Sequence, residues 1–124
     1  MTKNLWGDLS SLETVRTPKT ILEEQANLLT DATGGVLVGE VTGESQFGGF
    51  CYNLDVLVPA LNRYSYTILT VKYSVDAYPV TLTASRPLVY EQCGNEEELM
   101  AAIEKILSSR DVRSALSTLK SQVS

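Results

Sequence analysis

The sequence of 124 residues predicts a single α+β domain, in which helices pack on an antiparallel β-meander of about four strands. Apolar residues repeat at helical spacing near both ends of the chain and alternate with polar residues in between. The connections between the alternating segments are too short for parallel crossovers, so the strands are expected to form hairpins. We expect an N-terminal arm over 1–16, a helix over 17–33, antiparallel strands over 36–90 and two helices over 95–122.

The arm mixes apolar and polar residues and has no long apolar run. The spacing of Leu5, Leu9 and Leu12 is compatible with a short helical turn or with an arm that packs on the core. Trp6, the single tryptophan, is expected to anchor the arm, with partner binding as its alternative role. Because no signal peptide or membrane-spanning pattern is present, we expect a cytoplasmic protein that does not contact membranes.

The first helix has a clear start and a clear end. Thr17 is a favourable N-cap, and Pro18 suits the first helical position, where its missing N–H costs nothing. Gly34 and Gly35 end the helix, because glycine adopts the left-handed conformation that helix termini require.

The central segment predicts strands. They are expected at Val36–Thr42, Phe50–Val58, Tyr64–Tyr73 and Tyr78–Thr83, with a loop over Gly43–Gly49 and a short edge strand over Leu88–Tyr90. Strict alternation in the third strand would place Tyr64, Tyr66 and Ile68 on the face opposite to Leu69, Val71 and Tyr73.

The C-terminal third predicts two amphipathic helices. Asn95 with Glu98 resembles a capping box, and Ser109 is suited to cap the second helix. Both helices carry an apolar stripe that must pack on the sheet, on the other helix or on a second subunit. The stripe residues are Leu99, Met100, Ile103, Ile106 and Leu107 in the first helix and Val112, Ala115, Leu116 and Leu119 in the second.

Composition excludes several functional classes. The net charge of −5 and the scattered cations argue against nucleic-acid binding, which requires a basic face. Histidine is absent, which removes the commonest general base and the commonest zinc ligand. No phosphate-binding glycine motif occurs. The sequence therefore predicts no catalysis, no cofactor and no metal.

Three residues are candidates for chemistry. Asp55 lies in an apolar strand, on the face shared with Cys51 and Asn53, and that face is expected to be exposed to solvent. Cys51 lacks an activating neighbour and is expected to be a small half-buried residue. Cys93 precedes the Asn95 cap, and the helix N-terminus could lower the pKa of its thiol, which gives a weak redox hypothesis.

A recognition edge is predicted around the turn before the third strand. Tyrosine and arginine are enriched at protein interfaces, although tyrosine also suits cross-strand pairing in an ordinary sheet. The candidate binding residues are Asn62, Arg63, Tyr64 and Tyr66, together with Tyr78 and Asp55.

Three segments resemble a family of small uncharacterised bacterial proteins. They are RTPKTILEEQANLL (Arg16–Leu29), VPALNRYSYTIL (Val58–Leu69) and YPV (Tyr78–Val80). The resemblance implies a bacterial, cytosolic origin and carries no catalytic residue with it.

The leading hypothesis is a non-catalytic bacterial protein-interaction module, such as an adaptor, inhibitor or immunity-type protein. Its partner would be another protein or a second copy in a homodimer. The alternative is a small-molecule-binding domain with a pocket between sheet and helices. An enzyme that uses carboxylate or tyrosine chemistry ranks last.

Overall fold

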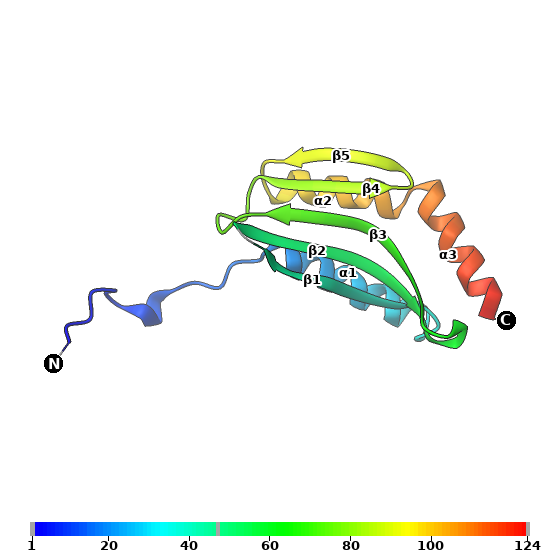
Figure 1. The fold of residues 1–124 in the computed structure, drawn as a ribbon, viewed down its shortest axis with the longest axis horizontal. Coiled ribbons are helices and arrows are strands. Elements are labelled where there is room, and N and C mark those ends of the chain that lie inside the picture. Colours follow the sequence, from blue (N-terminus) through cyan, green and yellow to red (C-terminus); the bar gives the residue numbers. More distant parts are fainter. Residues whose placement is uncertain (1, 47, 124) are drawn as a thin grey trace.

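The computed structural model describes residues 2–46 and 48–123 and shows a five-stranded antiparallel sheet with three α-helices in that part of the chain (Figure 1). In chain order the elements are the 3-10 helix η1 (Leu9–Ser11), α1 (Pro18–Ala32), β1 (Val38–Gln46), β2 (Gly49–Val58), the 3-10 helix η2 (Pro59–Leu61), β3 (Tyr64–Tyr73), β4 (Val80–Ser85), β5 (Leu88–Cys93), α2 (Glu96–Leu107) and α3 (Arg110–Val123).

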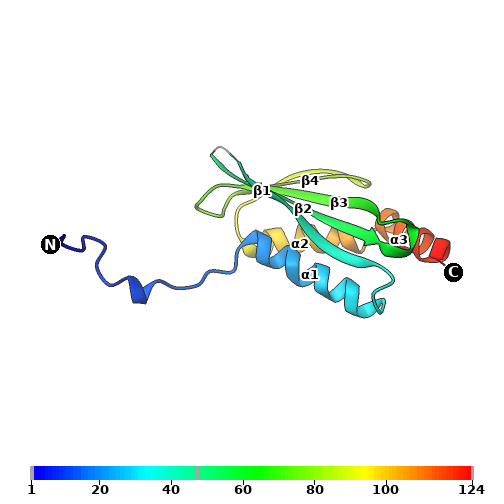
Figure 2. The ribbon, with the colours of Figure 1, turned by 60° about the horizontal axis from the view of Figure 1, so that its bottom comes forward.

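The strands follow one another in the order β1-β2-β3-β4-β5, which confirms the predicted meander and the α+β class. Helices α1 and α2 cover one face of the sheet and leave the other face open, while α3 lies at one end (Figure 2). The strand number of about four was wrong, because β5 is a full strand that pairs with β4 from Ser85↔Leu88 to Val80↔Cys93. This pairing satisfies the backbone of β4 and buries Cys93 in the core.

The predicted loop over Gly43–Gly49 is mostly strand. β1 continues to Gln46 and pairs with β2 up to Gln46↔Gly49. Residue 47 of that loop lies outside the described residues. Gly43 suits the strand because its φ is positive and a Cβ there would collide with the backbone of Cys51.

The predicted faces of β3 were wrong in its first half. Leu54 pairs with Leu69 and Asp55 with Thr67, so Ile68 is an extra residue in a β-bulge. A bulge shifts the alternation by one residue, and both Ile68 and Leu69 are therefore buried in the core.

The predicted helix caps are confirmed. The Thr17 side chain accepts from the Thr20 N–H, and Asn95 Oδ1 accepts from the Glu98 N–H at 2.8 Å. The Glu98 carboxylate in turn accepts from the Gly94 N–H at 2.8 Å. Ser109 Oγ accepts from the Val112 N–H at 3.3 Å at the start of α3. These caps depend on neighbouring residues only, which is why the sequence predicts them.

Helix α1 packs very closely on β1. A Cβ at Gly39 would lie 2.3 Å from the carbonyl oxygen of Ala26, so only glycine permits this approach. Thr30 Oγ1 accepts from the Gly39 N–H at 2.9 Å, and Thr33 Oγ1 donates to the Leu37 carbonyl at 2.8 Å. Side chains of α1 thus hold the chain as it enters the sheet.

The N-terminal arm extends away from the body of the molecule in both views (Figures 1 and 2). Trp6 is 82% exposed, and the short turn η1 contains no buried residue. Of the two alternatives for the arm, the short helical turn is present as η1, whereas packing of the arm on its own core was wrong. Met1 lies outside the described residues.

No helix within residues 2–46 and 48–123 combines the length and the apolar character that crossing a membrane requires.

Candidate functional site: a groove between the helices

The structure does not gather the predicted recognition residues into one site. Asn62 and Arg63 form a turn in the left-handed region, with φ of 57° and 61°, directly before β3. Tyr64 and Tyr66 pair with Val58 and Val56 at that end of the strand. Tyr78 lies beyond the opposite end of β3, before β4. Asn62, Arg63, Tyr64 and Tyr66 therefore lie together at one end of β3, and Asp55 pairs with Thr67 on the same strand, whereas Tyr78 lies apart from them.

Tyr78 is nevertheless unusual. Its hydroxyl is buried and has no hydrogen-bond partner among the described residues. Burial raises the pKa of this hydroxyl, and the nearby Glu96 carboxylate adds to the effect. The ring packs against the core, so its role in the described structure is structural.

Asp55 lies on the open face of the sheet, as predicted, but it is only 7% exposed. Thr42 Oγ1 donates to one of its carboxylate oxygens at 2.7 Å, and Thr67 Oγ1 donates to the other at 2.6 Å. Glu40 is its cross-strand partner on β1 and is exposed. Neither carboxylate lines the groove described below, and the Asp55 oxygens are already engaged.

The two cysteines are free thiols. Cys93 is buried, and burial raises the pKa of its thiol, with Glu91 and Glu98 adding to the rise. The suggestion that a helix N-terminus lowers this pKa was wrong, because desolvation of the thiolate dominates. Cys51 is half-buried, as expected from the sequence.

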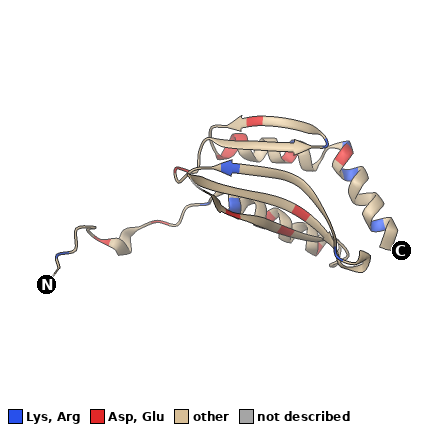
Figure 3. Cartoon of the chain, in the orientation of Figure 1, with Lys and Arg blue, Asp and Glu red and all other residues tan. Residues whose placement is uncertain are grey.

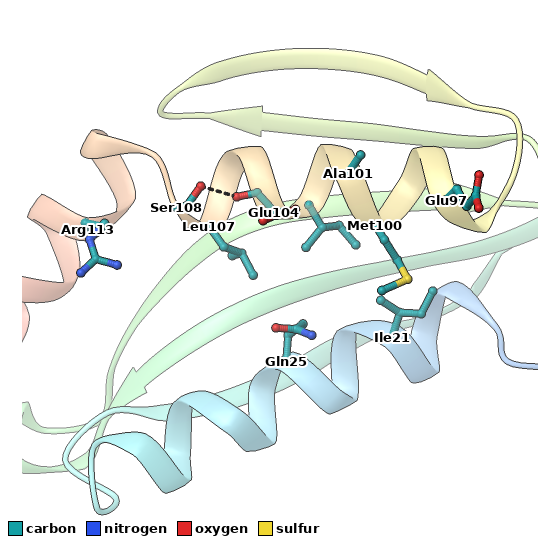
Figure 4. A pocket seen from close by; sticks show the side chains of 10 residues that line it. Ile21, Gln25, Glu97, Met100, Ala101, Glu104, Leu107, Ser108 and Arg113 are labelled. Atoms are coloured by element: carbon teal, nitrogen blue, oxygen red, sulfur yellow. Dashed lines mark hydrogen bonds between the residues drawn. The ribbon is translucent and has the colours of Figure 1, made fainter.

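A hollow lies between α1 and α2 (Figure 4). Its volume is about 630 Å³. Ile21 and Gln25 of α1 face Met100 and Leu107 of α2 across it, and Ser108 and Arg113 mark its far end (Figure 4).

This hollow continues toward α3 as two smaller ones, of about 240 and 200 Å³. Leu107 lines all three hollows, and Leu29 and Leu116 line both of the smaller ones. Leu54 and Ile68 of the sheet form the floor of the middle hollow. We call these three adjoining hollows together the helix groove; its walls are α1 on one side and α2 with α3 on the other.

Apolar side chains on the walls of the helix groove are left unburied. Leu28 is 59% exposed, and Leu29, Leu107 and Leu116 are half-buried. The groove exists because α3 turns away at the end of the sheet and does not lie against α1 (Figure 1). Exposed apolar walls with a polar rim are typical of surfaces that bind a partner.

Charge is unevenly distributed along the groove. Helix α3 carries Arg110, Arg113 and Lys120 against a single carboxylate, Asp111. Its cations stand out along the helix in Figure 3. The α3 end of the groove is therefore basic, whereas Glu97 and Glu104 of α2 line the main hollow.

Arg16 closes the other end of the groove. Its guanidinium donates to Glu96 at 3.2 Å, forms an ion pair with Glu24 and lies 3.4 Å from the sulfur of Met100. The hydrogen bond from Arg16 lowers the pKa of the Glu24 carboxyl. This cluster ties the start of α1 to the start of α2.

Sequence reasoning missed a second cluster, formed by aromatic rings. The rings of Phe50, Tyr52 and Tyr73 lie within 6.4 Å of one another between centroids, and Lys19 Nζ lies 5.3 Å from the Tyr52 ring. The strand pairing brings Phe50 opposite Tyr73. The cluster tethers the start of α1 to the sheet.

No group of residues within 2–46 and 48–123 has the composition and proximity of a metal site. Protein-family models, curated proteins and solved structures were all compared with the chain. None matched.

The sequence held one signal of the groove. Its predicted C-terminal helices carry more apolar surface than a small sheet covers, and a second subunit was one of the three ways to bury it. The sequence could not show where the excess would lie, because that depends on the direction of α3 relative to α1.

Proposed function

We propose that this protein is a non-catalytic protein-interaction module that docks a partner segment in the helix groove. The observation that carries the proposal is the row of adjoining apolar hollows between α1 and α2–α3, whose walls leave Leu28 exposed and three further leucines half-buried. Burying such side chains contributes roughly 1.5–3 kcal/mol each. An adaptor, an inhibitor or an immunity-type protein would each use such a surface, in a bacterial cytoplasm.

The groove fits an amphipathic helix or an extended apolar segment. Docking of a helix into a groove needs anchors spaced along one face, and Leu29, Leu107 and Leu116 supply contacts along its length. The basic wall of α3 favours a segment with acidic residues. Nucleic acid and membranes are not the proposed partners.

The test uses two exposed leucines. Leu28 lines the groove, whereas Leu88 is 88% exposed at the start of β5 and lies outside it. The tagged full-length protein and its variants Leu28→Glu and Leu88→Glu are cross-linked in the native cells, and the partners are identified by mass spectrometry. We expect the wild type and Leu88→Glu to recover the same partner and Leu28→Glu to lose it. Recovery of the same partner by all three proteins would refute the groove as the docking site.

A second candidate function is the binding of a small apolar molecule. The volume of the main hollow falls within the usual range for ligand pockets, on the order of 300–1,000 Å³. Native mass spectrometry of the purified protein would reveal a retained small molecule, and Leu28→Glu should remove it.

A further inference from the structure

The exposed arm is the strongest unexplained feature of the molecule. Four of its large apolar side chains are exposed, and Leu9 is nearly half exposed. Leu5, Leu9 and Leu12 share helical spacing, and Asp8 already caps the turn η1 through the Ser10 N–H. The arm therefore has the pattern of a segment that becomes ordered against an apolar surface. Its apolar residues are Leu5, Trp6, Leu9, Leu12 and Val15.

The helix groove has the matching character. Its walls expose leucines from α1, α2 and α3, and α3 adds a basic rim with Arg113 and Lys120. Between Leu5 and Val15 the arm carries Asp8 and Glu13 and no cation. Asp8 and Glu13 of the arm would thus complement Arg113 and Lys120 at the α3 end of the groove, whereas Glu97 and Glu104 line the main hollow beside α2.

The arm and the groove of one chain are poorly placed to meet. Arg16 is held by Glu24 and Glu96 at the near end of the groove, over Met100. The chain before Arg16 leaves away from the body in both views (Figures 1 and 2). To reach its own groove, the arm would have to reverse direction and pass over this ion-pair cluster. A second copy meets no such obstacle.

We propose that the arm of one copy docks in the helix groove of a second copy, in a reciprocal exchange that gives a symmetric dimer. Residues Leu5–Val15 are the docked segment, and α1 and α3 of the partner copy hold it. The exchange is isologous, since each copy supplies one arm and one groove. This inference rests on the proposed function and names a copy of this chain as the occupant of the groove.

The single tryptophan makes the docking measurable. Light scattering gives the mass of the full-length protein, and the emission of Trp6 reports whether the arm is buried. We expect a dimer with blue-shifted emission. Deletion of residues 2–15 should give a monomer. Leu28→Glu should raise the dissociation constant of the dimer about tenfold or more, so that the variant is a monomer with red-shifted Trp6 emission at concentrations where the wild type is a dimer. The matched control Leu88→Glu should behave as the wild type.

A complementation experiment separates arm exchange from other dimers. The arm-deleted chain keeps its groove, and Leu28→Glu keeps its arm, so a mixture of the two monomers should form a one-to-one heterodimer with blue-shifted emission. Circular dichroism melts show that each variant is folded.

Three results would overturn the exchange. They are a full-length monomer with solvent-exposed Trp6 at micromolar concentration, a monomer with buried Trp6, and a dimer that survives arm deletion. In each of these cases a Leu28→Glu protein that still loses its foreign partner would leave the proposed function standing. If Leu28→Glu changes neither self-association nor partner recovery, both proposals fail.

Discussion

Asp55 is the one buried charged residue among those the structure describes. Threonine hydroxyls from both neighbouring strands hold its carboxylate, one at each oxygen. Asn53, on the same face, adds a third side-chain hydrogen bond, since its Oδ1 accepts from Thr70 Oγ1 at 2.7 Å. We call these side-chain hydrogen bonds the polar ladder. Hydrogen bonds to a charged acceptor are stronger than those between neutral groups, so this ladder links β1, β2 and β3 on the open face.

Replacing Asp55 with alanine should therefore destabilise the fold. The Asp55→Ala variant loses two charge-assisted hydrogen bonds, and we expect the free energy of unfolding to fall by about 1–3 kcal/mol. Urea denaturation measures the loss. Its control is Glu40→Ala, which removes an exposed carboxylate on the adjacent strand and should change stability by less than about 0.5 kcal/mol. Equal effects of the two substitutions would contradict a structural role for the ladder.

The two cysteines should differ sharply in reactivity. Cys93 is 1% exposed and its thiol pKa is raised by burial, so little thiolate forms and reagents do not reach it. We expect iodoacetamide to modify the native protein at Cys51 first and to reach Cys93 only after unfolding. Peptide mass mapping over time checks this order. Fast modification of Cys93 in the native state would mean that the end of β5 opens readily.

At the scale of elements, the contact between α1 and β1 depends on one missing side chain. The backbone of Ala26 occupies the space that a Cβ at Gly39 would need, and a backbone atom cannot move aside as a flexible side chain can. The hydroxyls of Thr30 and Thr33 bond to the same stretch of chain, which fixes the approach of the helix.

Gly39→Ala should consequently be destabilising. Overpacking of this kind costs about 1–3 kcal/mol, and thermal unfolding would measure it as a lower Tm. Gly94→Ala is the matched control, because its added Cβ would meet only the Glu98 carboxylate at 3.4 Å, a side chain that can adjust. A Gly39→Ala protein with the same Tm as the control would show that α1 can shift on the sheet without loss of stability.

Helix α3 is the least anchored of the three α-helices. Among its residues only Val112 is fully buried, whereas α2 buries four residues and α1 buries Ile21, Leu22 and Ala26 among others. Segments with few buried contacts open at lower free energy than the core does. The same weak anchoring leaves the groove open.

At the scale of the whole molecule, we expect hydrogen exchange to be fastest in α3 among the three α-helices. Val112→Ala should accelerate the exchange of α3 amides by roughly tenfold or more, since removal of buried methyl groups costs more than 1 kcal/mol. The amides of α1 and α2 should keep their protection. A uniform acceleration across all three helices would show instead that α3 unfolds only with the core.

Arm exchange would add a concentration dependence to this pattern. A docked arm from a second copy contacts α3, so its amides should gain protection as protein concentration rises. The arm-deleted chain should show no such rise in protection. Its amide hydrogen exchange serves as the reference for a chain without a docked arm.

Much of the fold could be predicted because its signals are local. Thr17 and Asn95 cap their helices through residues three positions away, and alternation along Gly49–Val58 places Leu54 and Val56 in the core. The same alternation failed in β3, because the bulge at Ile68 arises from the pairing with β2 and leaves no local mark in the sequence.

The amino-acid sequence by itself determined the α+β class, the order of helices and strands, the caps and the lack of histidine chemistry. These follow from residue types and from spacings of a few residues. Only the tertiary structure decided that β5 is a full strand, that Asp55 is buried between threonines, that the arm stands free and that a groove separates α1 from α3. The physical reason is that these features depend on how distant segments meet, and on which apolar surfaces remain uncovered after they have met.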